Sequence, residues 1–324
     1  MVTVGIAFVA LVVLDRSRVG AGVSALRHVR PWLIAPAIVS ESASMVSFAR
    51  LQRRLLRAGS IELATGTMLA VTYAGNAISV SLPLAGSTMG SAYAYRAFRR
   101  FGADASLAGW SLAVSGLVST LMFSLILVGG ALSSGNSSAA VAGGLSGIVL
   151  VLPIALLVVA SRWEPLRSRG LRSARWVLSR SQQFIRRPSG DIDALLADTV
   201  EHLGALRLTR SSWLWVMWLS AWNWLADIAC LAFSIAALGA RVPWTGLVLA
   251  WGAGAGAASF GLTPGGLGVV EAALAAALVA VGIHATSALG AVLLYRFISL
   301  WLVVAVGWSV YGLTGRAIRG GTAS

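Results

Sequence analysis

Charged side chains are scarce in this chain of 324 residues, and lysine is absent altogether. Only 11% of the residues are charged, whereas about 25% are charged in an ordinary soluble domain. A soluble fold of this length could not cover itself with polar surface, so that class is excluded. The absence of lysine beside abundant alanine, glycine and arginine indicates the codon bias of a GC-rich genome rather than a chemical requirement.

Cysteine, histidine and nucleotide-binding motifs are also scarce or absent. Cys230 is the only cysteine and lies inside an apolar run, which excludes disulfides, cysteine-based zinc sites and iron–sulfur clusters within one chain. His28, His202 and His284 are far apart, and no His-x-x-x-His or aspartate-rich pair occurs, so no metal site is expected. Because no Walker motif is present, nucleotide hydrolysis is not expected either, and no cofactor is predicted.

Apolar runs recur along almost the whole chain, and 57% of the residues are hydrophobic. Since about 20 apolar residues span a bilayer, the sequence predicts an all-α polytopic membrane protein forming a single membrane domain over residues 1–324. The first run lacks the basic leader and Ala-x-Ala site of a signal peptide and is short for a span. The expected segments, about eight in all, cover residues 2–14, 31–49, 61–92, 107–131, 139–160, 211–238, 242–283 and 286–314.

Two of these segments, 61–92 and 242–283, contain too much glycine and proline for one plain helix each. The interruptions in the first are Gly75, Asn76, Pro83, Gly86 and Gly90, and those in the second are Gly252, Gly254, Gly256, Gly261, Thr263, Pro264, Gly265, Gly266 and Gly268. Non-helical backbone at membrane depth is tolerated only where protein buries it or where it lines a wet cavity, so these breaks predict a binding or translocation site. Close helix packing is the alternative, which we favour for Gly252 and Gly256, whereas the turn from Thr263 to Gly268 is interpreted as functional.

The net charge of +14 arises from arginines between the apolar runs, where they set topology and meet anionic headgroups, and no nucleic-acid partner is expected. Residues 161–210 form the longest polar stretch, predicted to be an arginine-rich cytoplasmic loop. Apolar residues at helical spacing within it predict an amphipathic helix. These are Leu195, Leu196, Val200, Leu203 and Leu206, beside Asp191, Asp193, Asp198 and Glu201.

The arginine clusters Arg50–Arg57, Arg96–Arg100 and Arg316–Arg319 are assigned to the cytoplasmic side with that loop, and the C-terminus with them. The loop from Arg16 to Arg30 violates this rule if it is external. With this topology, segment 61–92 leaves and re-enters on the cytoplasmic side, whereas segment 242–283 starts and ends outside. Two broken elements of opposite orientation are typical of an inverted-repeat transporter with a substrate site near the midplane.

Four ionisable residues lie inside predicted spans, namely Glu41, Asp227, Glu271 and Arg296, and each needs a partner there. Glu271 begins a helix, where its carboxylate can act as a cap. Arg296 lies too deep to reach an interface easily by snorkelling, so it must meet an acid, either Glu271 or Asp227, or a lipid phosphate. Proton coupling through Asp227 or Glu271 is conceivable.

The run Thr263-Pro-Gly-Gly-Leu-Gly-Val-Val-Glu271, followed by an alanine-rich helix, resembles the signature of the lysyl-phosphatidylglycerol synthase transmembrane, or flippase-like, domain family. The resemblance extends back to Asn76, Leu82-Pro-Leu-Ala-Gly86 and Arg96, and forward to Tyr295-Arg296. One departure is Ser87, where the family often has an acid after Gly86. A second is that two-part members continue into a soluble aminoacyl transferase domain, whereas this chain stops at Ser324, so it is not expected to make lysyl-phosphatidylglycerol itself.

The resemblance implies a flippase or transporter of a polar-headed lipid, such as a phospholipid, an aminoacylated phospholipid or a polyprenyl-linked glycan, in a bacterial cell membrane. Arg296 and Arg96 would contact the lipid phosphate, and the turn would offer backbone amides. The candidate substrate-binding residues are Asn76, Pro83, Gly86, Arg96, Asp227, Pro264, Gly265, Gly266, Gly268, Glu271, Tyr295 and Arg296. An intramembrane enzyme acting on lipid-linked substrates and a membrane scaffold or regulator are the alternatives, and assembly into an oligomer stays open.

Overall fold

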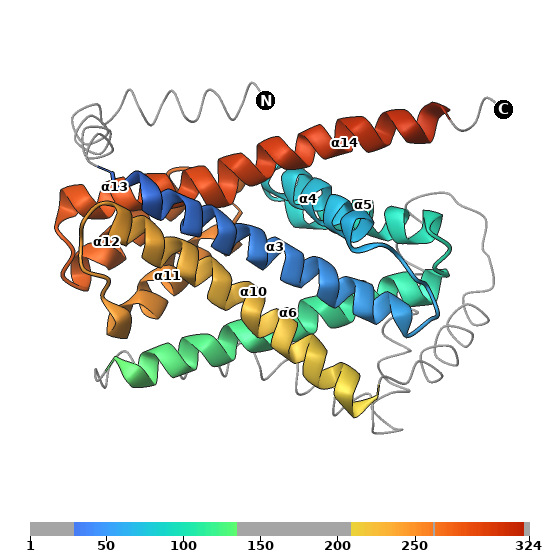
Figure 1. Cartoon of the computed structure of the whole chain (residues 1–324), viewed down its shortest axis with the longest axis horizontal. Coiled ribbons are helices and arrows are strands. Elements are labelled where there is room, and N and C mark those ends of the chain that lie inside the picture. The colour runs from blue at the N-terminus through green and yellow to red at the C-terminus, as the bar shows by residue number, and fades with distance from the viewer. Residues whose placement is uncertain (1–28, 135–208, 262, 321–324) are drawn as a thin grey trace, which may run out of the picture.

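The computed structural model describes residues 29–134, 209–261 and 263–320, which are helical apart from short connections (Figure 1). Its helices are α3 (Ile34–Arg57), α4 (Thr65–Ser81), α5 (Gly86–Arg100), α6 (Ala105–Ser133), α10 (Arg210–Ala237), α11 (Trp244–Ser259), α12 (Val269–Ala280), α13 (Ala285–Arg296) and α14 (Val303–Gly320). Shorter helical turns are η2 (Pro31–Leu33), η3 (Pro264–Gly266) and the π-helical η4 (Phe297–Leu302).

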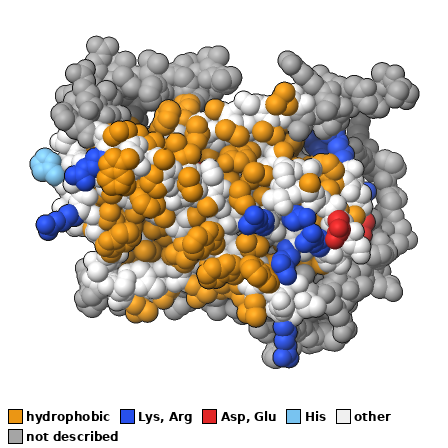
Figure 2. All heavy atoms as spheres, in the orientation of Figure 1, with side chains coloured by type: hydrophobic (Ala, Val, Ile, Leu, Met, Phe, Trp, Pro, Cys, Tyr) orange, Lys and Arg blue, Asp and Glu red, His pale blue; other side chains and the backbone are white. Residues whose placement is uncertain are grey.

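Among the described residues, four stretches are long and apolar enough to cross a membrane, namely Pro31–Arg57, Ala105–Ser133, Arg210–Ala237 and Ala285–Leu313. They run roughly along the long axis of Figure 1, and the face in Figure 2 carries apolar side chains in its middle with charged side chains toward both ends. The prediction of an all-α polytopic membrane protein is therefore confirmed. Six of the expected segments correspond to described helices, whereas segments 2–14 and 139–160 and most of the loop 161–210, with its predicted amphipathic helix, lie outside the described residues.

Helices α3 and α10 form a long antiparallel pair that anchors the bundle. At one end the Arg30 N–H donates to the Ala237 carbonyl at 2.9 Å. At the other end the guanidinium of Arg54 lies 5.5 Å from the ring centroid of Trp215. The start of α10 and the end of α3 therefore share one end of the molecule, which we call the arginine end because Arg50–Arg57 and Arg210 lie there.

The first broken segment is a hairpin, α4–α5, that starts and finishes at the arginine end. Arg53 of α3 holds its start, donating through Nη1 to the Thr65 hydroxyl at 3.2 Å. Gly86 allows the two helices to approach, because a Cβ at that position would lie only 1.8 Å from the Ser79 carbonyl oxygen. Between the helices, Leu84 has a positive φ of 57°, which is uncommon for a residue other than glycine.

The second broken segment, α11–η3–α12, enters from the opposite end, which carries Arg241 and His284 (Figure 1). Its tip meets the tip of the first hairpin, where the Leu84 N–H donates to the Gly261 carbonyl at 3.0 Å. The two broken segments thus have the opposite orientations that the arginine distribution predicts. Arg30 also lies at this opposite end, so this arginine departs from the rule by which the other arginine clusters were assigned to the cytoplasmic side.

The breaks are shorter than the glycine and proline content suggests. In the first segment the helix is interrupted only at residues 82–85, whereas Gly75 and Asn76 lie inside α4 and Gly90 inside α5. In α11 the glycines are helical, and a Cβ on Gly252 would lie 2.3 Å from Leu127 of α6. Gly252 therefore serves close packing, as expected, while a Cβ on Gly256 would meet nothing within 4 Å.

The arginine clusters extend helices rather than forming loops. Helix α3 continues to Arg57 and α5 to Arg100, both beyond the ends expected from the apolar runs. Arginine is a good helix former, and its long side chain can carry the charge to water while its methylene stem stays on apolar surface. A helix therefore need not end where its sequence changes from apolar residues to arginines at the membrane boundary.

Candidate functional site

A tight glycine turn connects α11 to α12 and builds one side of the site. Gly265, Gly266 and Gly268 have φ values of 62°, 67° and 85°, in the left-handed region that glycine adopts without steric cost. The turn is closed by the Gly266 N–H, which donates to the Thr263 carbonyl at 2.9 Å. Pro264 and Gly266 are buried, so the turn is packed within the protein.

Glu271 and Arg296 form an ion pair against this turn. Glu271 Oε1 lies 2.7 Å from Arg296 Nε, and each side chain is 11% exposed. The other carboxylate oxygen accepts from the Gly268 N–H at 2.6 Å, so Glu271 also caps α12. Arg296 Nη2 donates to the Gly265 carbonyl, which ties α13 to the turn. The predicted cap and one of the two predicted pairings of Arg296 are therefore both present.

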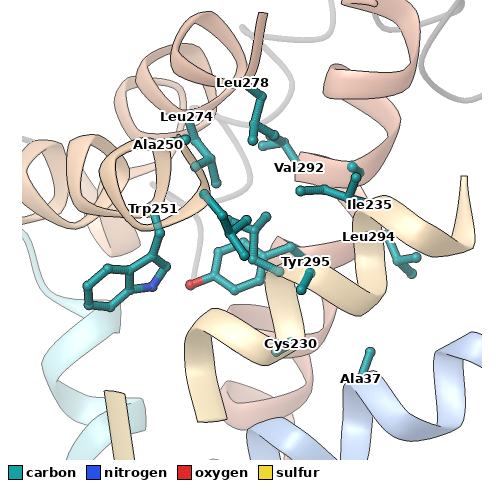
Figure 3. Close-up of a cluster of buried hydrophobic side chains, with 14 of the residues drawn as sticks. Ala37, Cys230, Ile235, Ala250, Trp251, Leu274, Leu278, Val292, Leu294 and Tyr295 are labelled. Carbon is teal, nitrogen blue, oxygen red and sulfur yellow. The ribbon is translucent and has the colours of Figure 1, made fainter. Parts of the chain in front are cut away.

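A second polar cluster surrounds Asp227 of α10. Tyr295 donates its hydroxyl to Oδ1 at 2.8 Å, and the Trp251 indole N–H donates to Oδ2 at 2.9 Å. Figure 3 shows the Tyr295 hydroxyl and the Trp251 ring nitrogen directed into the same space. Because Tyr295 and Arg296 are consecutive in α13, one helix carries a member of each cluster.

Glu41 of α3 belongs to the second cluster, although it is absent from the predicted substrate-binding set. Its side chain is buried, and its carboxyl group interacts directly with that of Asp227. Ser44, one turn along α3, contacts Asn223, one turn back along α10, at 3.3 Å, which fits the antiparallel register. Among the described residues, Glu41 Oε2 has no hydrogen-bond partner.

Residues 1–307 match the family described as the lysylphosphatidylglycerol synthase TM region. The chain belongs to this family. A comparison with curated proteins finds no match. In this lysylphosphatidylglycerol synthase TM domain, the sequence signature from Thr263 to Glu271 thus corresponds to the turn, the cap and the ion pair described above.

Other predicted residues take different positions in the domain. Asn76 donates to the Met45 sulfur at 3.5 Å, between α4 and α3. Pro83 lies at the exposed tip of the first hairpin, whereas Gly86 is buried just behind it. Arg96 is exposed on α5 toward the arginine end. The structure therefore gathers Asp227, the turn glycines, Glu271, Tyr295 and Arg296 around α13, with Asn76 and Arg96 on separate helices.

Two features of the site had no signal in the sequence. Trp251 hydrogen-bonds to Asp227 from α11, a helix that resembles a plain glycine-rich apolar segment in the sequence. The π-helical turn η4 begins directly after Arg296, and such turns are rare and frequently lie at functional sites.

Among the described residues, no group of three or more histidine, cysteine or acidic side chains could hold a metal ion.

Proposed function

We propose that this protein is a flippase that moves a polar-headed lipid across the bacterial cell membrane, with the arginine end, the loop 161–210 and the C-terminus in the cytoplasm. One observation carries the proposal: the Glu271–Arg296 pair lies beside the turn of one broken segment, and that segment meets an oppositely oriented broken segment tip to tip. Discontinuous helices of opposite orientation typically form transporter substrate sites near the bilayer midplane. Membership of the family supports a membrane role.

Arg296 is the residue we assign to the lipid phosphate. Its Nε and Nη2 are held by Glu271 and Gly265, whereas Nη1 has no hydrogen-bond partner among the described residues. A guanidinium nitrogen held at membrane depth can donate charge-assisted hydrogen bonds to a phosphate. Glu271 compensates the charge while no lipid is bound, since an unpaired arginine in the hydrocarbon region is costly.

Movement of the headgroup would follow from the two hairpins rocking about their shared tip. The acyl chains would remain in the bilayer while the headgroup passes the Glu271–Arg296 pair beside the turn. The exposed tips share one backbone hydrogen bond, from the Leu84 N–H to the Gly261 carbonyl, and behind it α4 packs on the turn η3, where Val80 lies close to Gly265. Separating the tips would break this hydrogen bond, which contributes about 0.5–1.5 kcal/mol net, together with the packing of α4 on η3.

Leaflet exchange in liposomes tests the proposal. Purified protein is reconstituted with fluorescent phospholipids or a polyprenyl-phosphate glycolipid, and exchange is measured for wild type, Glu271→Gln and Arg296→Met. Both variants should slow exchange by about tenfold or more, because a hydrogen bond to a charged group contributes about 1.5–3 kcal/mol. Glu62→Gln is the matched control, since Glu62 pairs with Arg57 at 3.9 Å and its side chain is 80% exposed.

The outcomes separate the competing functions. Absence of exchange with every lipid class by the folded protein would contradict a flippase and favour an intramembrane enzyme or a scaffold. Loss of exchange in Glu271→Gln but not in Arg296→Met would contradict the role of Arg296 in phosphate binding. A scaffold that works through the arginine-rich loop should lose its function when residues 161–210 are replaced by a neutral linker, whereas a flippase should largely keep its exchange activity.

A further inference from the structure

Two carboxyl groups, those of Glu41 and Asp227, meet inside the helical bundle, where Arg296 is the one cation of the described residues that acts on Asp227. Glu41 is 4% exposed, and one of its oxygens has no hydrogen-bond partner among the described residues. Asp227 is half-buried and takes its two donors, Tyr295 and Trp251, from other helices. Neither the cap of α12 nor the phosphate role of Arg296 accounts for this pair.

We propose that Glu41 and Asp227 form a buried proton-binding site that takes up one proton when an anionic lipid headgroup engages Arg296. The proposal rests on the flippase function proposed above and supplies its coupling ion. The proton comes from the aqueous phase and forms an O–H bond on one carboxyl group, which then donates a hydrogen bond to the other. No other bond forms or breaks.

Charge balance favours a proton in the pair. Among the described residues, Arg296 is the one cation that acts on Asp227, and its guanidinium is already bound to a third acid, Glu271. Two carboxylates in contact repel strongly where the dielectric is low, and an unpaired buried charge is costly. In the part of the chain that the structure describes, the remaining titratable groups around the pair are Tyr73 of α4, Cys230 of α10 and Tyr295 of α13, none of which supplies a positive charge.

The donor groups around Asp227 favour a proton over a metal cation. Calcium takes about 6–8 oxygen ligands, and magnesium needs an octahedron of them. Here both Asp227 oxygens face hydrogen-bond donors, and the Trp251 N–H is a donor that cannot act as a ligand. A protonated carboxyl group requires only one acceptor, which the neighbouring carboxylate provides.

Arg296 links the pair to the proposed lipid site. It follows Tyr295 directly in α13, and its positive charge acts on Asp227. A phosphate bound at Arg296 neutralises this charge, so the acid pair then binds a proton more readily. Linkage is reciprocal, so protonation of the pair must strengthen anionic headgroup binding by the same factor. Proton and anionic lipid would therefore cross together.

The site is tested first without transport, by infrared spectroscopy of the full chain in nanodiscs of zwitterionic lipid. A protonated carboxyl group has a C=O stretching band that a carboxylate lacks. Titration with short-chain phosphatidylglycerol at neutral pH should increase this band in wild type, with uptake of up to one proton per chain measured by an indicator dye. Glu41→Gln and Asp227→Asn should remove both signals, whereas Ser44→Ala, at the same helix interface, should retain them.

Each outcome bears on one proposal at a time. If phosphatidylglycerol binds, as followed by tryptophan fluorescence, but causes no proton uptake in wild type, the proton site is refuted and the flippase proposal stands. Uptake that persists in both Glu41→Gln and Asp227→Asn assigns the proton elsewhere and also refutes it. Should leaflet exchange be absent while the band still depends on Glu41 and Asp227, the flippase proposal fails and the proton-binding pair remains.

Discussion

The Glu271–Arg296 pair should make a large contribution to stability, which a double-mutant cycle can measure. The variants are Glu271→Gln, Arg296→Met and the double variant. Glutamine keeps an oxygen that can accept from the Gly268 N–H but leaves Arg296 without a carboxylate. Methionine removes the guanidinium while keeping an unbranched apolar chain, which leaves Glu271 charged beside the turn.

The expected magnitude follows from burial. Both side chains are 11% exposed and their atoms lie 2.7 Å apart, so removing one partner leaves a nearly buried charge. Such changes cost about 3–5 kcal/mol. The double variant leaves neither charge unpaired, so it should be less destabilised than the sum of the single variants, with a coupling energy of about 0.5–3 kcal/mol. At about 2 °C per kcal/mol, each single variant should lower the Tm by about 6–10 °C.

The assay is thermal unfolding of the purified protein in detergent, followed by tryptophan fluorescence at a fixed scan rate. Glu62→Gln removes one partner of the exposed Arg57–Glu62 pair, whose atoms are 3.9 Å apart, and should cost about 1 kcal/mol or less. The reasoning is refuted if Glu271→Gln and Arg296→Met lower the Tm no more than this control. Strict additivity in the double variant would likewise show that the two charges do not interact.

Two further substitutions test the hairpin and the second cluster. Gly86→Ala should destabilise the protein by about 1–3 kcal/mol in the same unfolding assay, because its Cβ would lie 1.8 Å from the Ser79 carbonyl. Gly109→Ala in α6, where a Cβ meets nothing within 4 Å, should instead be neutral or stabilising, and equal effects would contradict the close approach. Trp251→Phe keeps an aromatic ring but removes the 2.9 Å hydrogen bond to Asp227, so it should lower the free energy of unfolding by about 1–3 kcal/mol. An unchanged Tm would show that this hydrogen bond contributes nothing to stability.

The arrangement of the described helices was predictable because it depends on long-range averages of composition. Apolar length identified the spans, and the arginine distribution predicted that the two broken segments enter from opposite ends. Single glycines were less informative, since Gly75 and Gly252 lie within helices. A glycine breaks a helix only where the neighbouring sequence also favours a turn, as Pro83 and Pro264 do beside the two tips.

The site was predictable where its residues are close in sequence. Gly268 and Glu271 are three residues apart, which fixes the cap before any tertiary contact is known. The partners of Asp227 come from α3, α11 and α13, and no local pattern selects Glu41 or Trp251 among the many residues of those helices. An ionisable residue in an apolar span indicates that a polar partner must exist. Tertiary packing decides which residue becomes that partner.

Helix α13 gives a physical reason for the two clusters to respond together. Consecutive helical residues point about 100° apart, so Tyr295 can reach Asp227 on α10 while Arg296 faces the turn and Glu271 on α12. Displacing the turn with Arg296 attached would rotate or shift α13, which strains the Tyr295–Asp227 hydrogen bond. The π-helical turn η4 directly after Arg296 separates this part of the helix from α14, which packs against α4 of the other hairpin. Movement of either hairpin would therefore reach the acid pair through one helix, which is the coupling that the proposed proton-linked lipid movement requires.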